Sequence, residues 1–195
     1  MENCTFFAML SRMKYINRWG LMNCTRQENL SEHSLETAII ANALATIANK
    51  RLNKSIDSCR VAVMAIFHDC SEIITGDMPT PIKYYNSKIK HAYKDIEQDS
   101  ADKLLDRLPT DLRTEYEPFI AHSDDNAELY RYVKAADKLS ALIKCIDELK
   151  MGNSEFKSAQ KSIQKAVNKM ANELEEVKIF VEEFLPAYSL TLDEQ

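Results

Sequence analysis

The stretch FHDCSEIITGD, at residues 67–77, decides both the fold and the place where chemistry is expected. It follows an apolar run, VAVMAI at residues 61–66. At 3.6 residues per helical turn, His68 and Glu72 continue the apolar face of that run, and Asp69 lies at its border. Because unpaired buried charge is costly, these side chains are expected to be neutralised by a partner, a proton or a metal ion.

Apolar residues at helical spacing predict helices along almost the whole chain. The quoted stretch is expected to lie on one helix that begins at Asp57 or Ser58 and ends at Thr75–Gly76. The segment Asp77–Pro81 is expected to be a rigid extended loop, because its prolines fix their own φ. Further helices are expected at about residues 6–13 (running out near Gly20), 29–50, 88–108, 112–120, 126–150 and 158–184.

Composition and spacing together predict an all-α protein, a single helical bundle with one domain over residues 1–195. Only 3 residues are glycine and 5 are proline, whereas Ala, Leu, Lys, Glu and Ile are frequent, which is typical of helical proteins. The sequence contains no internal repeat, low-complexity segment or flexible linker. We therefore expect little or no sheet.

The charge pattern favours a small-molecule partner. The net charge is −5 and no basic stripe with interleaved aromatics occurs, so nucleic-acid binding is not expected. The first residues lack the cations of a signal peptide, and no apolar run approaches the ~20 residues that span a bilayer. The five cysteines are scattered singly, as in proteins of a reducing cytosol. A cytoplasmic protein without membrane association is expected.

Four side chains from three predicted helices form a candidate metal site: His33, His68, Asp69 and Asp137. Two imidazoles and two carboxylates suit a divalent ion of Mn, Co, Fe, Ni or Zn, with water completing the shell. A single helical histidine is more often a hydrogen-bonded core or surface residue than a ligand. The conjunction of all four favours a site, whereas His91 and His122 lie in polar surroundings and are expected to be solvated.

The order His, His-Asp, Asp on helices resembles that of the HD-domain metal-dependent phosphohydrolases. More narrowly, the chain resembles the bacterial 5′-deoxynucleotidases in segments spread through most of its length: NRW at 17–19, ENLSEHSL at 28–35, FHDCSEIITGDMPTPIKYYN at 67–86 and KAADKLSA at 134–141. The block at 67–86 is a specific match, whereas an HD pair alone is not. Cys70 and Met78 stand where a small residue such as Ala and a Leu are typical, and neither alters the chemistry.

The resemblance implies that one divalent transition metal, such as Co or Mn, is bound by His33, His68, Asp69 and Asp137. Asp69 and Asp137 would also contact the substrate, a deoxyribonucleoside 5′-monophosphate. A metal-activated water would split it into deoxyribonucleoside and phosphate. Arg18 would hold the phosphate with the fork geometry of its guanidinium and assist catalysis. A homodimer is implied as well.

The resemblance also implies roles around the nucleoside and the attacking water. Trp19 would pack near the nucleoside, although by residue type alone this indole fits a core anchor at a helix end equally well. Glu72 would orient or deprotonate the water. Asp77 would contact the 3′-hydroxyl or assist the leaving oxygen, and sequence leaves both open. The sugar would be lined by Asp77, Met78, Pro79 and Thr80. A rigid wall there would disfavour a ribose 2′-hydroxyl.

Rival functions predict different sequence features. A triphosphohydrolase of the same superfamily, or a hydrolase of guanosine tetraphosphate, would need more Lys and Arg near the site than Arg18 and Lys83. A two-metal cyclic-nucleotide phosphodiesterase would need further histidine ligands, and only His91 and His122 remain. A non-catalytic scaffold whose metal holds helices together would have a closed ligand shell and no role for Arg18 or Glu72.

Overall fold

The computed structural model describes residues 4–83, 85–121 and 126–195, and these ranges contain helices and no strand. The α-helices are α1 (Phe6–Leu10), α2 (Leu30–Arg51), α3 (Ser58–Phe67), α4 (Glu72–Thr75), α5 (Thr80–Lys83), α6 (Ser87–Leu105), α7 (Thr110–Ile120), α8 (Ala127–Lys150), α9 (Lys157–Glu173) and α10 (Glu175–Glu183). The 3₁₀ helices are η1 (Ser11–Tyr15), η3 (Ser154–Phe156), η4 (Leu185–Ser189) and η5 (Leu192–Glu194). The prediction of an all-α protein is confirmed.

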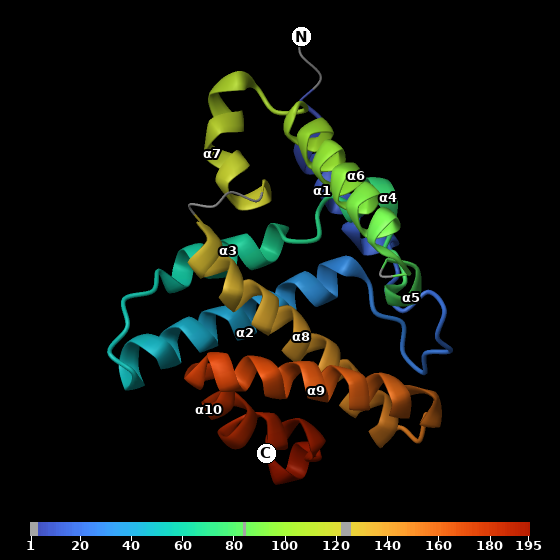
Figure 1. The fold of residues 1–195 in the computed structure, drawn as a ribbon, viewed down its shortest axis with the longest axis vertical. Helices are drawn as coiled ribbons and strands as arrows, with labels where there is room; N and C mark the ends of the chain where they lie inside the picture. The colour runs from blue at the N-terminus through green and yellow to red at the C-terminus, as the bar shows by residue number, and fades with distance from the viewer. Residues whose placement is uncertain (1–3, 84, 122–125) are drawn as a thin grey trace.

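Helices α2, α3 and α8 form the centre of the molecule (Figure 1). In this view α9 and α10 lie in the lower part of the molecule, and α1, α6 and α7 lie in the upper part. A larger apolar core among the central helices, α9 and α10 includes the fully buried Leu44 and Leu139. A smaller core around α1 and α6 includes Phe6 and also takes Leu30 from α2 and Cys70 from the quoted stretch. The start of α2 and the end of α3 therefore lie where the two cores meet.

Local sequence fixes where α2 and α3 begin. The side chain of Asn29 accepts hydrogen bonds from N–H groups in the first turn of α2, and the carboxylate of Glu32 accepts from the N–H of Asn29. The expected start of this helix at Asn29 is confirmed. The carboxylate of Asp57 accepts from the N–H of Arg60 and caps α3. Gly76, at φ +74°, ends α4 as predicted.

The helix predicted to run through the whole quoted stretch is wrong in its second half. α3 ends at Phe67, and the shorter α4 begins at Glu72. Between them the chain forms a tight turn, in which the N–H of Glu72 bonds the carbonyl of Asp69 at 3.0 Å. The imidazole of His68 also bonds the carbonyl of Ala65, at 2.7 Å. A helix end lacks backbone partners for its last carbonyls, so this ring helps to end α3 there.

The N-terminal helix is also shorter than predicted. Regular α-helix ends at Leu10, and η1 continues only to Tyr15. The chain then runs without a helix to the start of α2 at Leu30. Next to Gly20, where the first helix was expected to run out, Trp19 has a left-handed conformation with a φ of +60°. At this turn the side chain of Arg18 contacts Asp69, and the indole of Trp19 packs against Phe156.

Two further segments differ from expectation. The segment after α4 is not wholly extended, because Thr80 begins α5. The helix predicted for the C-terminal part is interrupted at Leu174, whose extended backbone (φ −130°, ψ 104°) separates α9 from α10. In the part of the chain that the structure describes, we find no helix with the length and apolar character needed to cross a membrane.

Candidate active site

The predicted metal ligands come together where the two cores meet. His33 lies in the first turn of α2, His68 and Asp69 directly follow α3, and Asp137 lies in the middle of α8. Ligand atoms of His33, His68 and Asp69 all lie within 4.8 Å of one another. Oδ1 of Asp137 is 3.3 Å from Nε2 of His33. We call these four side chains the HHDD cluster.

The ring of His68 is oriented by the backbone. Its Nδ1 donates to the carbonyl of Ala65 at 2.7 Å, and because a carbonyl only accepts, the lone pair of the neutral ring is left on Nε2. Nε2 is buried without a hydrogen-bond partner among the described residues. It lies 3.1 Å from Oδ2 of Asp69. A buried ring nitrogen beside a carboxylate fits a site that a metal ion completes in place of a proton.

The ring of His33 is oriented by side chains. Its Nδ1 lies 3.1 Å from Oγ of Ser140, and that hydroxyl donates to the carboxylate of Glu36 at 2.5 Å. Because the single proton of Ser140 goes to Glu36, its oxygen accepts from Nδ1–H of His33. Nε2 of His33 is therefore also left with a lone pair. Ser140 and Glu36 were not predicted, although each lies three residues after a predicted ligand.

The electrostatics of the HHDD cluster suit a cation. Burial raises the pKa of Asp69, but His68 and then His33 outweigh it and hold that pKa well below its usual range. Burial likewise raises the pKa of Asp137, and Lys138 and His33 more than offset it, so the pKa is lowered. Burial lowers the pKa of His33. Two ionised carboxylates and a neutral imidazole are the donor types that bind divalent transition metals.

Arg18 lies against the HHDD cluster. Its Nη1 donates to Oδ2 of Asp69 at 3.3 Å, and its Nε is 3.5 Å from Oε2 of Glu28. Burial lowers the pKa of this guanidinium, but Asp69, Asp137 and Glu28 outweigh burial and the pKa is raised. Nε has no hydrogen-bond partner among the described residues. A buried, charged guanidinium with unused donor capacity is suited to an anionic ligand.

Trp19 and Asp77 form a wall next to Arg18. The backbone N–H of Trp19 donates to Oδ2 of Asp77 at 3.3 Å, and the indole N–H donates to Glu28 at 2.7 Å. The indole packs against Phe156 with ring centroids 5.3 Å apart. The contact with the buried Phe156 fits an indole that anchors the chain in the core. The ring is only partly buried, which leaves a surface that a nucleoside could contact.

Glu72 is buried close to the cluster without a hydrogen bond for its Oε2 in the described part of the chain. Burial, with the negative charges of Asp69 and Asp77, raises the pKa of Glu72 to about 9. This carboxyl is thus protonated at neutral pH unless positive charge is added nearby. Unpartnered, buried and strongly shifted carboxyls are typical of groups that exchange protons in reactions.

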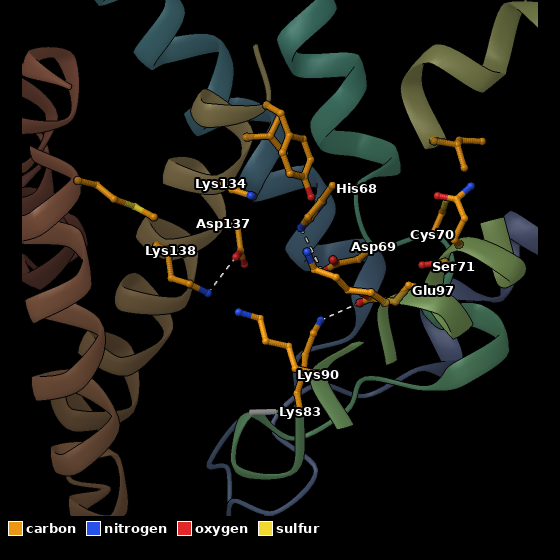
Figure 2. Close-up of a pocket in the computed structure, with 16 residues that line it drawn as sticks. His68, Asp69, Cys70, Ser71, Lys83, Lys90, Glu97, Lys134, Asp137 and Lys138 are labelled. Carbon is orange, nitrogen blue, oxygen red and sulfur yellow. Dashed lines mark hydrogen bonds and ion pairs between the residues drawn. The ribbon is translucent and has the colours of Figure 1, made fainter. Parts of the chain in front are cut away.

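A cavity of about 480 Å³ opens against the HHDD cluster, and His68, Asp69 and Asp137 form part of its wall (Figure 2). The wall also contains five lysines from α5, α6 and α8: Lys83, Lys90, Lys94, Lys134 and Lys138. We call them the lysine wall. The expectation that Arg18 and Lys83 supply most of the positive charge near the site is therefore wrong. Helix spacing does not reveal that lysines of separate helices face one cavity.

Of the two remaining histidines, the structure describes only His91, which does not join the site. His91 is exposed on α6 and donates to the carbonyl of Ser87 at 2.6 Å, as expected for a solvated residue. His122 lies outside the described residues. Among the residues that the structure describes, no further histidine accompanies His33 and His68.

Comparison with protein families finds a match to the family described as 5′-deoxynucleotidase YfbR-like, over residues 5–188. A 5′-deoxynucleotidase of Erwinia tasmaniensis is 48% identical over 195 residues, covering 100% of this chain and 97% of that protein. A 5′-deoxynucleotidase of Vibrio cholerae is 43% identical over 194 residues, covering 100% of this chain and 99% of that protein.

Two solved structures share the fold. An HD-domain phosphohydrolase from Listeria innocua superposes with a TM-score of 0.82 at 21% identity, covering 94% of this chain and 88% of that one. A cyanophage S-2L HD phosphohydrolase, DatZ, bound to dA and one catalytic Zn²⁺ ion, superposes with a TM-score of 0.65 at 19% identity. That match covers 92% of this chain and 95% of the phage protein. At these identities the likeness concerns the HD-domain fold.

Proposed function

Because the chain belongs to the family of YfbR-like 5′-deoxynucleotidases, we propose that the HHDD cluster is the centre of its active site. The protein hydrolyses deoxyribonucleoside 5′-monophosphates to deoxyribonucleoside and phosphate in a metal-dependent reaction. One observation supports this location more than any other: both histidines have their Nδ1 occupied and direct the other nitrogen toward two partly buried carboxylates.

In this proposal His33, His68, Asp69 and Asp137 hold one divalent transition metal, with Co or Mn as candidates. When bound, the ion would neutralise charge on the phosphate and lower the pKa of an attacking water. The protein fixes the imidazole tautomers, so neither ring has to be reoriented before it can act as a ligand.

Arg18 is proposed to hold the phosphate of the substrate. Its guanidinium already faces Asp69, and a phosphate at the cluster would meet donors held in a planar fork. Glu28 supports this arrangement, because its carboxylate contacts both the guanidinium and the indole N–H of Trp19. Arg18 would contribute to binding and also to catalysis, since charge on the phosphate oxygens is redistributed in the transition state.

Glu72 is proposed to take the proton from the attacking water. Its pKa of about 9 makes it protonated without a metal, because burial and two neighbouring carboxylates disfavour its charge. That pKa would fall when a divalent cation occupies the cluster, so metal loading would prepare Glu72 as a base. Asp77 remains a candidate for contact with the 3′-hydroxyl or for assistance to the leaving oxygen.

The nucleoside is proposed to lie along Trp19 and the segment of Asp77, Met78, Pro79 and Thr80. Asp77 is tied to the backbone of Trp19, so the two parts of this wall are linked. A fixed wall favours deoxyribose, because a 2′-hydroxyl there would be crowded or left without a partner. Stacking on an indole gives weak discrimination among bases.

We further propose a cytoplasmic homodimer. All five cysteines are free thiols, which suits a reducing compartment. Leu35 and Ile39, one turn apart on α2, are each 62% exposed and could be covered by a second copy. The molar mass in solution tests the dimer, and a monomer at micromolar concentration would contradict it.

The test of the proposed site compares Glu72→Ala with Asp137→Ala. The first variant should keep its metal and lose roughly 100-fold in rate, the usual scale for a general acid–base group. The second should lose metal as well as rate, because it removes a ligand. Elemental analysis and single-turnover release of deoxynucleoside from dAMP distinguish them. Normal turnover by Glu72→Ala would remove this residue from the mechanism.

A further inference from the structure

The side chains proposed to bind the phosphate and the nucleoside lie on one loop, residues 16–29, which connects η1 to α2. Backbone hydrogen bonds join the two ends of this loop. The N–H of Leu30 donates to the carbonyl of Ile16 at 3.0 Å. The N–H of Arg18 donates to the carbonyl of Glu28 at 2.9 Å. The second bond holds Glu28 directly across the loop from Arg18.

The far part of the loop is fixed to the end of α8 and to η3. Lys144 donates to the carbonyl of Arg26 at 2.5 Å, and the side-chain amide of Asn153 donates to the carbonyl of Asn23 at 2.7 Å. The N–H of Asn23 donates in turn to Oε1 of Glu155 at 3.2 Å. Because the backbone of the loop is held at several points, the side chains that it carries contact one another on a fixed frame.

One carboxylate oxygen contacts both of the side chains that are proposed to bind substrate. Oε2 of Glu28 accepts from the indole N–H of Trp19 at 2.7 Å and lies 3.5 Å from Nε of Arg18. The side chains of Arg18 and Glu28 are only 12% and 13% exposed, so water screens this ion pair less than it would screen a pair on the surface. Because the oxygen is shared, a shift of one side chain moves the partner of the other.

Trp19 offers this oxygen a fixed donor. Its backbone lies in the left-handed region at φ +60°, which is uncommon for a residue with a side chain, and its N–H donates to Asp77 at 3.3 Å. Its ring packs against Phe156 with centroids 5.3 Å apart. Since the indole is held through its backbone and through its ring, its N–H determines where Oε2 of Glu28 lies.

Arg18 has a second carboxylate partner, which belongs to the HHDD cluster. Nη1 of Arg18 donates to Oδ2 of Asp69 at 3.3 Å. A dication bound to the cluster would draw the charge of Asp69 away from the guanidinium. Glu28 lies outside the cluster, so it would still hold Arg18 when the metal is bound.

We propose that Glu28 is a positioning residue through which the indole N–H of Trp19 holds the guanidinium of Arg18 in place for a phosphate. Trp19 then acts on the phosphate end of the substrate as well as on the nucleoside. The assignment of these two ends rests on the proposed function, whereas the link between Arg18 and Trp19 rests on the contacts of Glu28. Such a link is reciprocal, so a phosphate bound by Arg18 also changes the surroundings of the indole.

The fluorescence emission of Trp19 tests the link, because Trp19 is the only tryptophan of the chain. Orthophosphate, which has no base to contact the ring, is added to the full chain loaded with Mn²⁺, and calorimetry gives the concentration that saturates each protein. Saturating orthophosphate should change the emission of the wild type. Glu28→Gln should bind orthophosphate about threefold to tenfold more weakly and lose most of the emission change at saturation. No change in the wild type, or an equal change in Glu28→Gln, would overturn the proposal.

Hydrolysis of 2-deoxyribose 5-phosphate, a substrate without a base, tests the link from the side of the indole. Trp19→Phe keeps an aromatic ring and removes the N–H that Glu28 accepts. Trp19→Phe and Glu28→Gln should each lower kcat/KM for this substrate about fivefold, the scale of one hydrogen bond. The double variant should lose no more than the larger single loss, because both changes break one link. Additive losses would overturn the proposal, and so would an unchanged rate in Trp19→Phe, which an indole that only stacks on the base predicts.

The matched control is Glu155→Gln. Glu155 is exposed, and its carboxylate also accepts from the 16–29 loop, at Asn23. This variant should keep the emission change and should keep kcat/KM within about twofold of the wild type. Equal losses in Glu155→Gln and Glu28→Gln would overturn the proposal, because any weakening of the loop would then suffice. Trp19→Phe leaves the charge of Glu28 beside Arg18, so it tests the link even if Glu28→Gln does not fold.

The two measurements also separate this link from the proposed function. An emission change that requires Glu28 would support the link even if neither dAMP nor 2-deoxyribose 5-phosphate were hydrolysed. Hydrolysis of dAMP without any such emission change would overturn the link and leave the 5′-deoxynucleotidase activity intact.

Discussion

The two histidines of the HHDD cluster offer the same ring nitrogen but are held by different parts of the molecule. His68 is oriented by the carbonyl of Ala65, three residues earlier at the end of α3. His33, on α2, is oriented by Ser140 on α8 and through it by Glu36. One support depends on the shape of a helix end, and the other on the packing of two helices. Only the second can be removed by changing a side chain that is not a ligand.

The largest expected effect tests whether the rings are equivalent as ligands. His33→Ala and His68→Ala should each lower metal affinity at least ~100-fold and abolish turnover at ordinary metal concentration. Chelation of the wild type should do the same, and added Co²⁺ or Mn²⁺ should restore it. Elemental analysis beside rate measurements checks this. Either variant with full metal content and full rate would show that its ring is not a ligand.

The next effect probes the side-chain support of His33. Ser140→Ala and Glu36→Ala should weaken metal binding by about 10- to 100-fold, because the ring loses the partner that fixes its tautomer. Ser140→Thr keeps the hydroxyl and should lose less. Competition with a chelator gives the affinity, and the absorption bands of the Co²⁺-loaded protein report ligand geometry. Asp147→Asn is the control, because Asp147 lines the same 310 Å³ cavity as Glu36 without contacting Ser140. If Ser140→Ala bound metal as tightly as the control variant, Ser140 would not be needed to orient His33.

A second long-range support on α8 predicts an effect on stability. Glu148 is fully buried and accepts from Lys144 and from the N–H groups of Thr25 and Arg26, in the loop that leads to α2. Burial raises its pKa, but these bonds, with one from Asn153, outweigh burial and lower the pKa to about 2. A lowered folded-state pKa contributes stability above the unfolded value, which is lost as the carboxylate is protonated.

The melting temperature of the wild type should therefore fall as pH decreases from about 4.5 toward 2. Glu148→Gln should be less stable at neutral pH and should show a shallower fall over that interval. The exposed Glu173→Gln serves as the comparison. If the melting temperature of Glu148→Gln fell with pH as steeply as that of the wild type, Glu148 would not cause the loss of stability in acid.

The smallest effect concerns the turn that follows His68. Cys70 is buried there, and burial raises the pKa of its thiol to about 12. Alkylation of the native protein should label the exposed Cys4 and Cys59 and leave both Cys70 and the rate of turnover unaffected. Mass spectrometry after short exposure checks this. Rapid labelling of Cys70 would show that the turn opens. The hydrogen bond from His68 to Ala65 would then not hold the ring in one orientation.

The helices and the residues of the HHDD cluster could be predicted because both were read from local spacing; whether these residues bind a metal ion stays a prediction. Asn29 and Asp57 cap helices through bonds within three residues, and His33 lies in the first turn of a helix whose face is visible in the sequence. The break after Phe67 could not be predicted, because the continuing apolar periodicity gives no sign that the ring of His68 takes a backbone carbonyl.

The hydrogen bonds that orient His33, and the lysine wall, depend on which helix faces meet. Sequence spacing places Lys90 with Lys94 and Lys134 with Lys138, but only the packed chain brings α6 and α8 to one cavity. In the same way, Ser140 shares a helix face with Asp137, yet its contact with His33 requires α2 beside α8. These features are tertiary, so reading one helix at a time cannot reveal them.

The unequal supports of the two rings also set the order in which the cluster is completed during synthesis. The carbonyl that orients His68 is available as soon as α3 forms, whereas Ser140 is made 107 residues after His33. A chain emerging from the ribosome therefore carries one oriented imidazole and its neighbouring carboxylate long before the other half exists. If the cluster holds a metal ion as proposed, high-affinity uptake has to await the docking of α8, which brings Asp137 and Ser140 to the half formed earlier.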